Sequence, residues 1–182
     1  MKKRLSALLA AALAVSMLTL PAGAVSQSTA LETIQALGIL AGDSQGNLNL
    51  SSAVTRAEFV TMMTAASSYK DTVGSGYGVS LFKDVKSSHW ASEYIRLAVE
   101  QNWMTGYTDG TFRPEATITR AEVTAITNRL LDRAADEDYV DDHAGELRQF
   151  SDVSASYWAY HDIVEATNAH SYRVYDGEEH WM

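Results

Sequence analysis

The tetrapeptide Thr-Arg-Ala-Glu occurs twice, at residues 55–58 and 119–122, and it carries residue types that could bind an anion. A threonine followed three residues later by a glutamate is the pattern of a capping box. The threonine hydroxyl accepts a hydrogen bond from the third helical amide, and the glutamate carboxylate accepts one from the amide of the threonine. Two helices are therefore predicted to begin here. The predicted helix-capping residues are Thr55, Glu58, Thr119 and Glu122.

In each copy the arginine is the first residue of the predicted helix. Arg56 and Arg120 would lie beside backbone N–H groups that have no helical partner, at the positive end of the helix dipole. A guanidinium and free amides together can bind an anion. The alternative is that each arginine forms an ion pair with a nearby carboxylate of the protein. Because the arrangement occurs twice in matching contexts, we favour an anion-binding site.

The composition narrows the class of protein. The 182 residues suit one ordinary domain or a few small repeats around a shared core. The formal net charge of −9 disfavours binding to nucleic acid and to anionic lipid. Cysteine is absent from the sequence, which excludes disulfide bonds, thiolate zinc sites and cysteine nucleophiles. Burial of apolar side chains must therefore hold the fold together.

Residues 1–24 have the pattern of a secretory signal peptide. Basic residues at positions 2–4 precede an apolar stretch over residues 5–20, and small residues follow up to Ala24. We predict cleavage after Ala24, export, and no membrane insertion of the remaining chain, whose formal charge would be about −12. A membrane anchor is the alternative, but the apolar stretch is short for a span and no second one exists in the sequence.

Internal repetition defines the organisation of the chain. Gly42 and the first Thr-Arg-Ala-Glu lie 64 positions before Gly106 and the second copy. The pattern Phe-x-Asp-Val recurs at a spacing of 68, at residues 82–85 and 150–153. Agreement at this many positions predicts helix-loop-helix repeats. The predicted segments are repeat 1 at 25–70 without its early half, a Gly/Ser linker at 71–81, a complete repeat 2 at 82–133, an acidic linker at 134–149, and a partial repeat 3 at 150–182 without a Thr-Arg-Ala-Glu helix.

Apolar periodicity predicts a mostly α fold. The first helix of each repeat is expected near residues 31–38, 90–102 and 158–169. Three amphipathic helices can enclose a common core where one could not, so we expect these first helices to share a three-helix core. Only short loop-edge pieces such as residues 82–85 could pair as strands.

At these motifs the sequence resembles the S-layer homology (SLH) domain family of bacterial surface proteins. The residues that carry the resemblance are Phe82-x-Asp84-Val85, His89-Trp90-Ala91, Gly106-Tyr107-x-Asp109-Gly110-Thr111-Phe112-x-Pro114 and Ile118-Thr119-Arg120-Ala121-Glu122. The match is strong over residues 82–131, good over 31–67 and partial over 150–170. The resemblance implies SLH-type helix-loop-helix repeats in a pseudo-threefold bundle, with grooves between neighbouring repeats that hold a sugar.

The resemblance also implies a function. Such domains anchor secreted proteins to the cell wall or S-layer by binding secondary cell-wall polysaccharide, commonly through pyruvylated sugar ends. A pyruvyl ketal presents a carboxylate, which a capped helix start with an arginine is suited to receive. The residues implied in ligand binding are Arg56, Arg120, Asp84, Trp90, Gly106, Tyr107, Asp152 and Trp158. The two arginines would bind the carboxylate, although both tryptophans could instead be core anchors.

The missing parts of the repeats leave other functions open. Without a third Thr-Arg-Ala-Glu, at most two arginine-bearing sites can form. The alternative function is a structural or protein-interaction module of the cell surface, with degenerate sugar sites and other surface proteins as partners. An enzyme is not expected, because no acidic pair or Ser/His/Asp set stands in a recognisable catalytic motif. The five histidines lack metal-binding spacing, so no catalytic residue, metal or cofactor is predicted.

Overall fold

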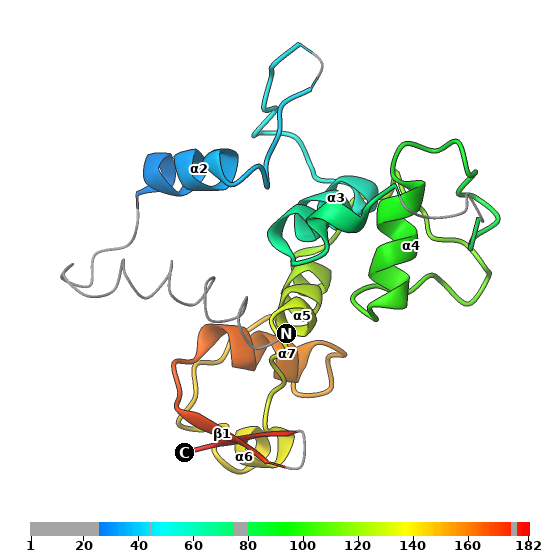
Figure 1. The fold of residues 1–182 in the computed structure, drawn as a ribbon. Helices are drawn as coiled ribbons and strands as arrows, with labels where there is room; N and C mark the ends of the chain where they lie inside the picture. The colour runs from blue at the N-terminus through cyan, green and yellow to red at the C-terminus, as the bar shows by residue number, and fades with distance from the viewer. Residues whose placement is uncertain (1–25, 44, 75–79, 176–177) are drawn as a thin grey trace.

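The computed structural model describes residues 26–43, 45–74, 80–175 and 178–182 (Figure 1). The predicted signal peptide, residues 1–24, lies outside the described residues, as do residues 75–79 of the predicted Gly/Ser linker. Within these described ranges, every helix is too short or too polar to cross a membrane.

Helices dominate the described part of the chain, so the prediction of a mostly helical fold is confirmed. The elements are α2 (Gln27–Ala36), α3 (Arg56–Ala66), the short 3₁₀ helix η1 (Lys70–Thr72), α4 (Ser92–Glu100), α5 (Arg120–Leu130), α6 (Glu137–Asp142), α7 (Tyr160–Thr167), β1 (Tyr172–Tyr175) and β2 (Glu178–Trp181). The two strands form an antiparallel hairpin in which Tyr172 lies opposite Trp181.

Both predicted capping boxes are present. At α3 the Thr55 hydroxyl accepts from the Glu58 amide at 3.2 Å, and the Glu58 carboxylate accepts from the Thr55 amide at 2.8 Å. Thr119 and Glu122 make the same pair of bonds at the start of α5, at 3.2 and 2.8 Å. Each box therefore fixes the first residue of its helix, as the sequence predicted.

The 64-residue repeat of the sequence is also a repeat of backbone structure. The starts and ends of α3 and α5 are both 64 residues apart. In the loop before each helix, a turn residue donates its amide to the carbonyl four positions on, at 2.9 Å for Asp43 and 2.7 Å for Tyr107. The turn glycines Gly46 and Gly110 have φ of +83° and +80°, a left-handed conformation that favours glycine.

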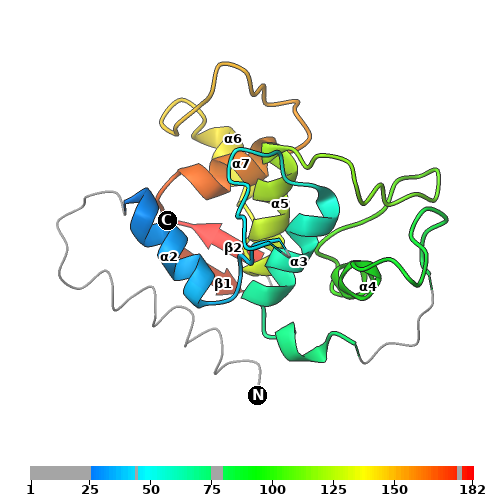
Figure 2. The same cartoon turned by 90° about the horizontal axis from the view of Figure 1, so that it is seen from above.

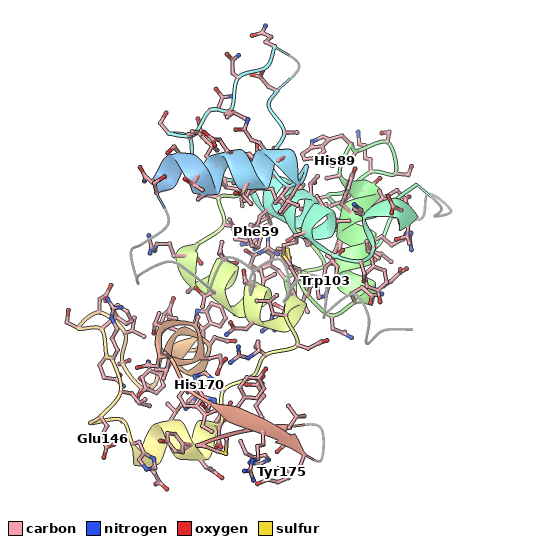
Figure 3. All side chains as sticks on the ribbon, turned by 60° about the vertical axis from the view of Figure 1, so that its left-hand side comes forward. Phe59, His89, Trp103, Glu146, His170 and Tyr175 are labelled. Atoms are coloured by element: carbon pink, nitrogen blue, oxygen red, sulfur yellow. The ribbon has the colours of Figure 1, made fainter. Side chains whose placement is uncertain are left out.

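The main hydrophobic core lies between α3, α4 and α5 and the loop that joins α4 to α5 (Figure 2). Val60, Ile95, Met104 and Phe112 are its largest fully buried apolar side chains. The Trp103 ring packs against the core and meets Tyr69 edge-on, with centroids 5.8 Å apart (Figure 3). Each large apolar side chain contributes roughly 1.5–3 kcal/mol when fully buried, so this core is the main source of stability.

A smaller second core joins α6, α7 and β2 through Val140, Tyr160, Val164 and Trp181. The acidic segment 134–149, which was expected to be a linker, therefore contains a packed helix. Asp136 caps α6 by accepting from the Tyr139 amide at 3.0 Å, and Val140 is fully buried among acidic neighbours. Val140 is the only buried residue of α6, and one buried residue gives too weak a periodic signal to indicate a helix.

The expected core of three first helices is not confirmed. α4 packs against α3, and α7 packs against α5, whereas α2 has no buried residue and stands apart (Figure 1). Each packed first helix lies on the capped helix of the preceding repeat. In repeat 3 the hairpin of β1 and β2 stands where a capped helix would follow, so α2 has no equivalent surface to cover.

Candidate ligand pocket

Arg56 is buried at the boundary between repeats 1 and 2, with 4% of its surface exposed. Its Nε donates to the Phe112 carbonyl at 2.9 Å, and one Nη donates to the Thr105 carbonyl at 3.1 Å. The other Nη forms an ion pair with Glu122 Oε1 at 2.9 Å. Three of the five guanidinium N–H donors are therefore used by the protein, and two remain.

The start of α3 is docked onto the loop of repeat 2. The amides of Arg56 and Ala57 donate to the carbonyls of Ala116 and Pro114, both at 2.9 Å. The predicted free amides beside Arg56 are therefore already bonded to protein, and they are not available to an anion. The sequence could not indicate this, because the acceptors lie about sixty residues further along the chain. Any ligand here must be bound by side chains.

Arg56 lines a pocket of about 270 Å³ to which all three repeats contribute. Its walls are Arg56, Met104, Thr105, Gly106, Tyr107, Glu122, Ala125, Ile126, Arg129 and Trp158. Four of the eight predicted ligand-binding residues are thus brought together, namely Arg56, Gly106, Tyr107 and Trp158. The pocket combines two guanidinium groups with two aromatic rings, an arrangement suited to an anionic group attached to a flat apolar ring face.

Tyr107 is held in place by cationic neighbours. The Arg56 and Arg113 guanidinium carbons lie 5.0 and 3.9 Å from the centre of its ring. Arg113 in turn pairs with Asp109 at 3.1 Å. Hydrogen bonds from the Thr111 hydroxyl and amide lower the pKa of Asp109 to about 2, so this carboxylate stays charged in all but strong acid. The loop that presents Tyr107 is therefore fixed by charged contacts.

Gly106 has a steric reason to be glycine. A Cβ at this position would clash with the Phe82 ring and lie 2.8 Å from the Thr111 carbonyl oxygen. The close approach of Phe82 therefore shapes the wall of the pocket.

The other four predicted ligand residues lie outside the pocket. Asp84 supports it indirectly, because its carboxylate accepts from the amides of Phe112 and Arg113 at 2.9 and 2.8 Å. Burial opposes ionisation of Asp84, but these two bonds outweigh it and lower its pKa. Trp90 is exposed and stacks on His89, with centroids 5.8 Å apart.

Arg120 and Asp152 are both exposed, and their side chains make no hydrogen bond or ion pair with a described residue. Arg120 occupies the same helical position as Arg56, but it is exposed, and no loop in the described part of repeat 3 covers it. The two copies of one motif therefore differ in burial and in partners.

Two functional features of the pocket were not foreseen. Arg129 lies in the last turn of α5, and the only hydrogen bond of its guanidinium to a described residue is to the Trp103 carbonyl, at 3.4 Å. Glu122 has two roles, because Oε2 caps α5 while Oε1 binds Arg56. The 64-residue spacing places Ala65 at the position that matches Arg129, so the repeat gave no signal for this arginine.

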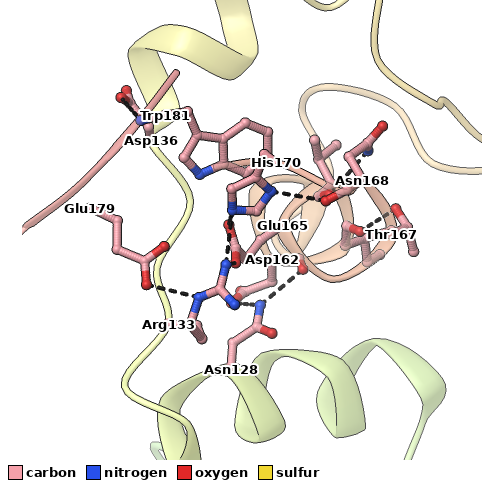
Figure 4. Close-up of polar contacts among 12 residues, drawn as sticks. Asn128, Arg133, Asp136, Asp162, Glu165, Thr167, Asn168, His170, Glu179 and Trp181 are labelled. Atoms are coloured by element: carbon pink, nitrogen blue, oxygen red, sulfur yellow. Dashed lines mark hydrogen bonds and ion pairs between the residues drawn. The ribbon is translucent and has the colours of Figure 1, made fainter. Parts of the chain in front are cut away.

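A second charged cluster lies between β2 and α7 (Figure 4). Arg133 pairs with the buried carboxylates of Glu165 and Glu179 at 2.5 and 2.8 Å and contacts His170 Nε2 at 2.8 Å. Ligand atoms of Glu165, His170 and Glu179 lie within 4.8 Å of one another, a donor set that divalent cations use. The Arg133 guanidinium already forms ion pairs with both glutamates and contacts His170, so we interpret the cluster as an ion-pair network that fastens the hairpin to α7.

The sequence comparisons agree with this geometry. The model of the S-layer homology domain matches residues 23–60 and 81–124. The chain is 34% identical to the Cellulosome-anchoring protein of Acetivibrio thermocellus over 146 residues, which are 80% of this chain and 31% of that protein. It is 27% identical to the Surface layer protein of Brevibacillus choshinensis over 141 residues, 72% of this chain and 13% of that protein.

The chain is an S-layer homology domain protein over residues 23–60 and 81–124. Family membership confirms the prediction of a non-catalytic module and of a location at the cell surface. The chain spans 31% or less of the length of these two relatives.

Proposed function

We propose that this protein is a cell-surface anchoring module whose Arg56 pocket binds an acidic secondary cell-wall polysaccharide. The observation that carries the proposal is the pocket itself, in which Arg56 and Arg129 lie beside Tyr107 and Trp158. The names of the relatives, an anchoring protein and a surface layer protein, support a role at the cell surface.

The charges in the pocket favour an anionic ligand. Arg56 is neutralised by Glu122 but keeps two N–H donors. Arg129 forms no ion pair with a described residue, so its charge gives the pocket a net positive character. A carboxylate, such as that of a pyruvyl ketal, can accept charge-assisted hydrogen bonds from both groups. We therefore assign Arg129 as the main charge partner and Arg56 as a supporting donor.

The aromatic side chains favour a sugar as the carrier of this carboxylate. Trp158 is 58% exposed although it is the largest apolar residue of the pocket. A pyranose ring has an apolar face that can cover such an indole. This contact buries apolar surface, and the sugar hydroxyl groups keep their hydrogen bonds.

An alternative function is a structural or protein-interaction module. It is favoured by Arg120 and Trp90, which match Arg56 and Trp158 in the repeat but lie outside the pocket. A module with one pocket would bind polysaccharide more weakly than one with several, because multivalency is lost.

The test uses the two equivalent tryptophans. The secreted protein and its Trp158→Ala and Trp90→Ala variants are titrated with purified cell-wall sacculi, before and after chemical removal of pyruvate. Both tryptophans are more than half exposed, so both variants should fold. Trp158→Ala should weaken binding by about 10-fold, and Trp90→Ala should bind like the wild type.

The two treatments separate the parts of the proposal. Weaker binding after pyruvate removal would support the ketal carboxylate as ligand, whereas unchanged binding would assign another acidic group. Equal binding by the two tryptophan variants would contradict a role for the Arg56 pocket and favour the protein-interaction alternative.

A further inference from the structure

Each of the two helices that begin with a capping box, α3 and α5, packs against the first helix of the following repeat. α3 packs against α4, and α5 packs against α7 in the corresponding way. At the first of these contacts, repeat 2 also supplies the carbonyls of Pro114 and Ala116 to the amides at the start of α3. It further supplies the Glu122 carboxylate to the incoming arginine. A receiving repeat therefore offers a first helix, backbone acceptors and a carboxylate.

In repeat 1, α2 is the first helix that could pack against an incoming helix. Leu31 and Ile34 lie 64 positions before Ile95 and Ala98, which α4 buries almost completely in the main core. In α2 the same positions stay partly exposed, because no described helix lies on them. α2 thus has an apolar face at the right positions and no partner for it.

Repeat 1 also presents the backbone acceptors. Leu50 and Ser52 lie 64 positions before Pro114 and Ala116. Their carbonyls accept no backbone hydrogen bond from the described residues. The Leu50 side chain is 64% exposed, whereas Pro114 is buried. Figure 1 shows this loop projecting beyond the other elements, so an incoming segment could reach it.

The carboxylate is supplied by Glu58. Its Oε2 caps α3 in the way that Glu122 Oε2 caps α5. Glu122 Oε1 binds Arg56, but Glu58 Oε1 has no partner among the described residues. An arginine at the start of an incoming helix would find here the same carboxylate oxygen that Arg56 finds on Glu122.

From these three matches we propose a docking site formed by α2, the Leu50–Ser52 segment and Glu58. Its ligand is an amphipathic helix of another polypeptide, and this helix begins with a Thr-Arg-x-Glu capping box. A second copy of this chain does not fit, because its α3 and α5 are already covered by α4 and α7. Repeat 3 carries the hairpin instead of such a helix. The site is separate from the Arg56 pocket and does not depend on its function.

The probe is a labelled synthetic peptide with the sequence of residues 117–131 of this chain, which contains a capping box and an amphipathic helix. The secreted protein is titrated against it by fluorescence anisotropy. The peptide with Arg120→Ala is the first control. It should bind about 10-fold more weakly or worse, because it lacks the charge-assisted bond to Glu58.

Two exposed leucines of the protein give a matched pair of variants. Leu50→Lys places a positive charge where the incoming arginine must approach and should weaken peptide binding by about 10-fold or more. Leu131→Lys makes the same change at a leucine that is 52% exposed and distant in sequence from the docking site, and it should bind like the wild type. Hydrogen exchange should slow in α2 when the peptide is bound.

Three results would overturn the proposal. The first is an absence of saturable binding at peptide concentrations up to about 1 mM, where even a weak interaction would be seen. The second is equal binding of the peptide and its Arg120→Ala form. The third is unchanged binding to the Leu50→Lys protein, which would mean that the peptide replaces α5 in its own position.

Discussion

The contrast between Arg56 and Arg120 leads to a direct test of the structure. The two residues share one motif and one helical position, so reasoning from the local sequence gives them the same importance. Arg56→Ala removes three hydrogen bonds and leaves the carbonyls of Thr105 and Phe112 without their donor. It also leaves the Glu122 carboxylate, 24% exposed, without its partner. Arg120→Ala removes no hydrogen bond or ion pair with a described residue.

The expected costs follow from these contacts. Breaking a buried ion pair costs about 3–5 kcal/mol, and the partial exposure of Glu122 places this site near the lower end, at about 3 kcal/mol. For a chain of this size, that loss lowers Tm by roughly 6–12 °C. Arg120→Ala should change the free energy of unfolding by no more than about 0.5 kcal/mol, as is usual for exposed residues.

The assay is urea unfolding of both variants followed by tryptophan fluorescence and circular dichroism, with scanning calorimetry for Tm. Trp103 lies in the main core, so its emission reports on the part of the fold that Arg56 stabilises. Equal destabilisation by the two substitutions would refute the structural distinction. A stable Arg56→Ala protein would show that the buried contacts of Arg56 contribute little.

Two further predictions concern the pocket wall and the second core. Gly106→Ala should destabilise the protein by about 1–3 kcal/mol because a Cβ would push into Phe82, whereas Gly145→Ala, which meets no atom within 4 Å, should be nearly neutral in the same unfolding assay. Burial raises the pKa of Glu165 above 4.5, although the charges of His170 and Arg133 oppose this. The folded state then binds the proton more tightly, so the Glu165 contribution to stability is largest below pH 4.5 and is lost as pH rises through the folded pKa. Between pH 4.5 and the folded pKa of Glu165, the free energy of unfolding should therefore fall less steeply with pH in Glu165→Gln than in the wild type or in the exposed control Glu146→Gln. Identical slopes in the three proteins would contradict a raised pKa of Glu165.

The helix starts could be predicted because their determinants are local. A capping box needs only four consecutive residues, and both boxes formed at Thr55 and Thr119 as expected. The repeat spacing was equally informative, since turn geometry depends on residues such as Gly46 and Gly110 within the loop itself. Local chemistry therefore determined where α3 and α5 begin and how the loops before them turn.

The positions of the first helices and the structure of the acidic segment could not be predicted in this way. Whether a first helix is buried depends on the helix it meets, and α2 has the required apolar positions but no capped helix to cover. The acidic segment forms α6 because Val140 packs in one cluster with Tyr160 and Trp181, which are distant from it in sequence. Periodicity within a segment carries no information about such partners.

The sequence by itself determined the repeats, the helix caps and a set of candidate site residues, although that set did not include Arg129. Only the tertiary structure decided which of them form it. Arg56 is buried because the carbonyls of Thr105 and Phe112 and the carboxylate of Glu122 converge on it from repeat 2. Arg120 meets no equivalent loop among the residues that the structure describes. Trp158 lines the pocket and Trp90 does not, although both occupy the same repeat position. A side chain's role here is set by acceptors and rings that reach it from other repeats, and the spacing within one repeat does not specify which neighbours are present.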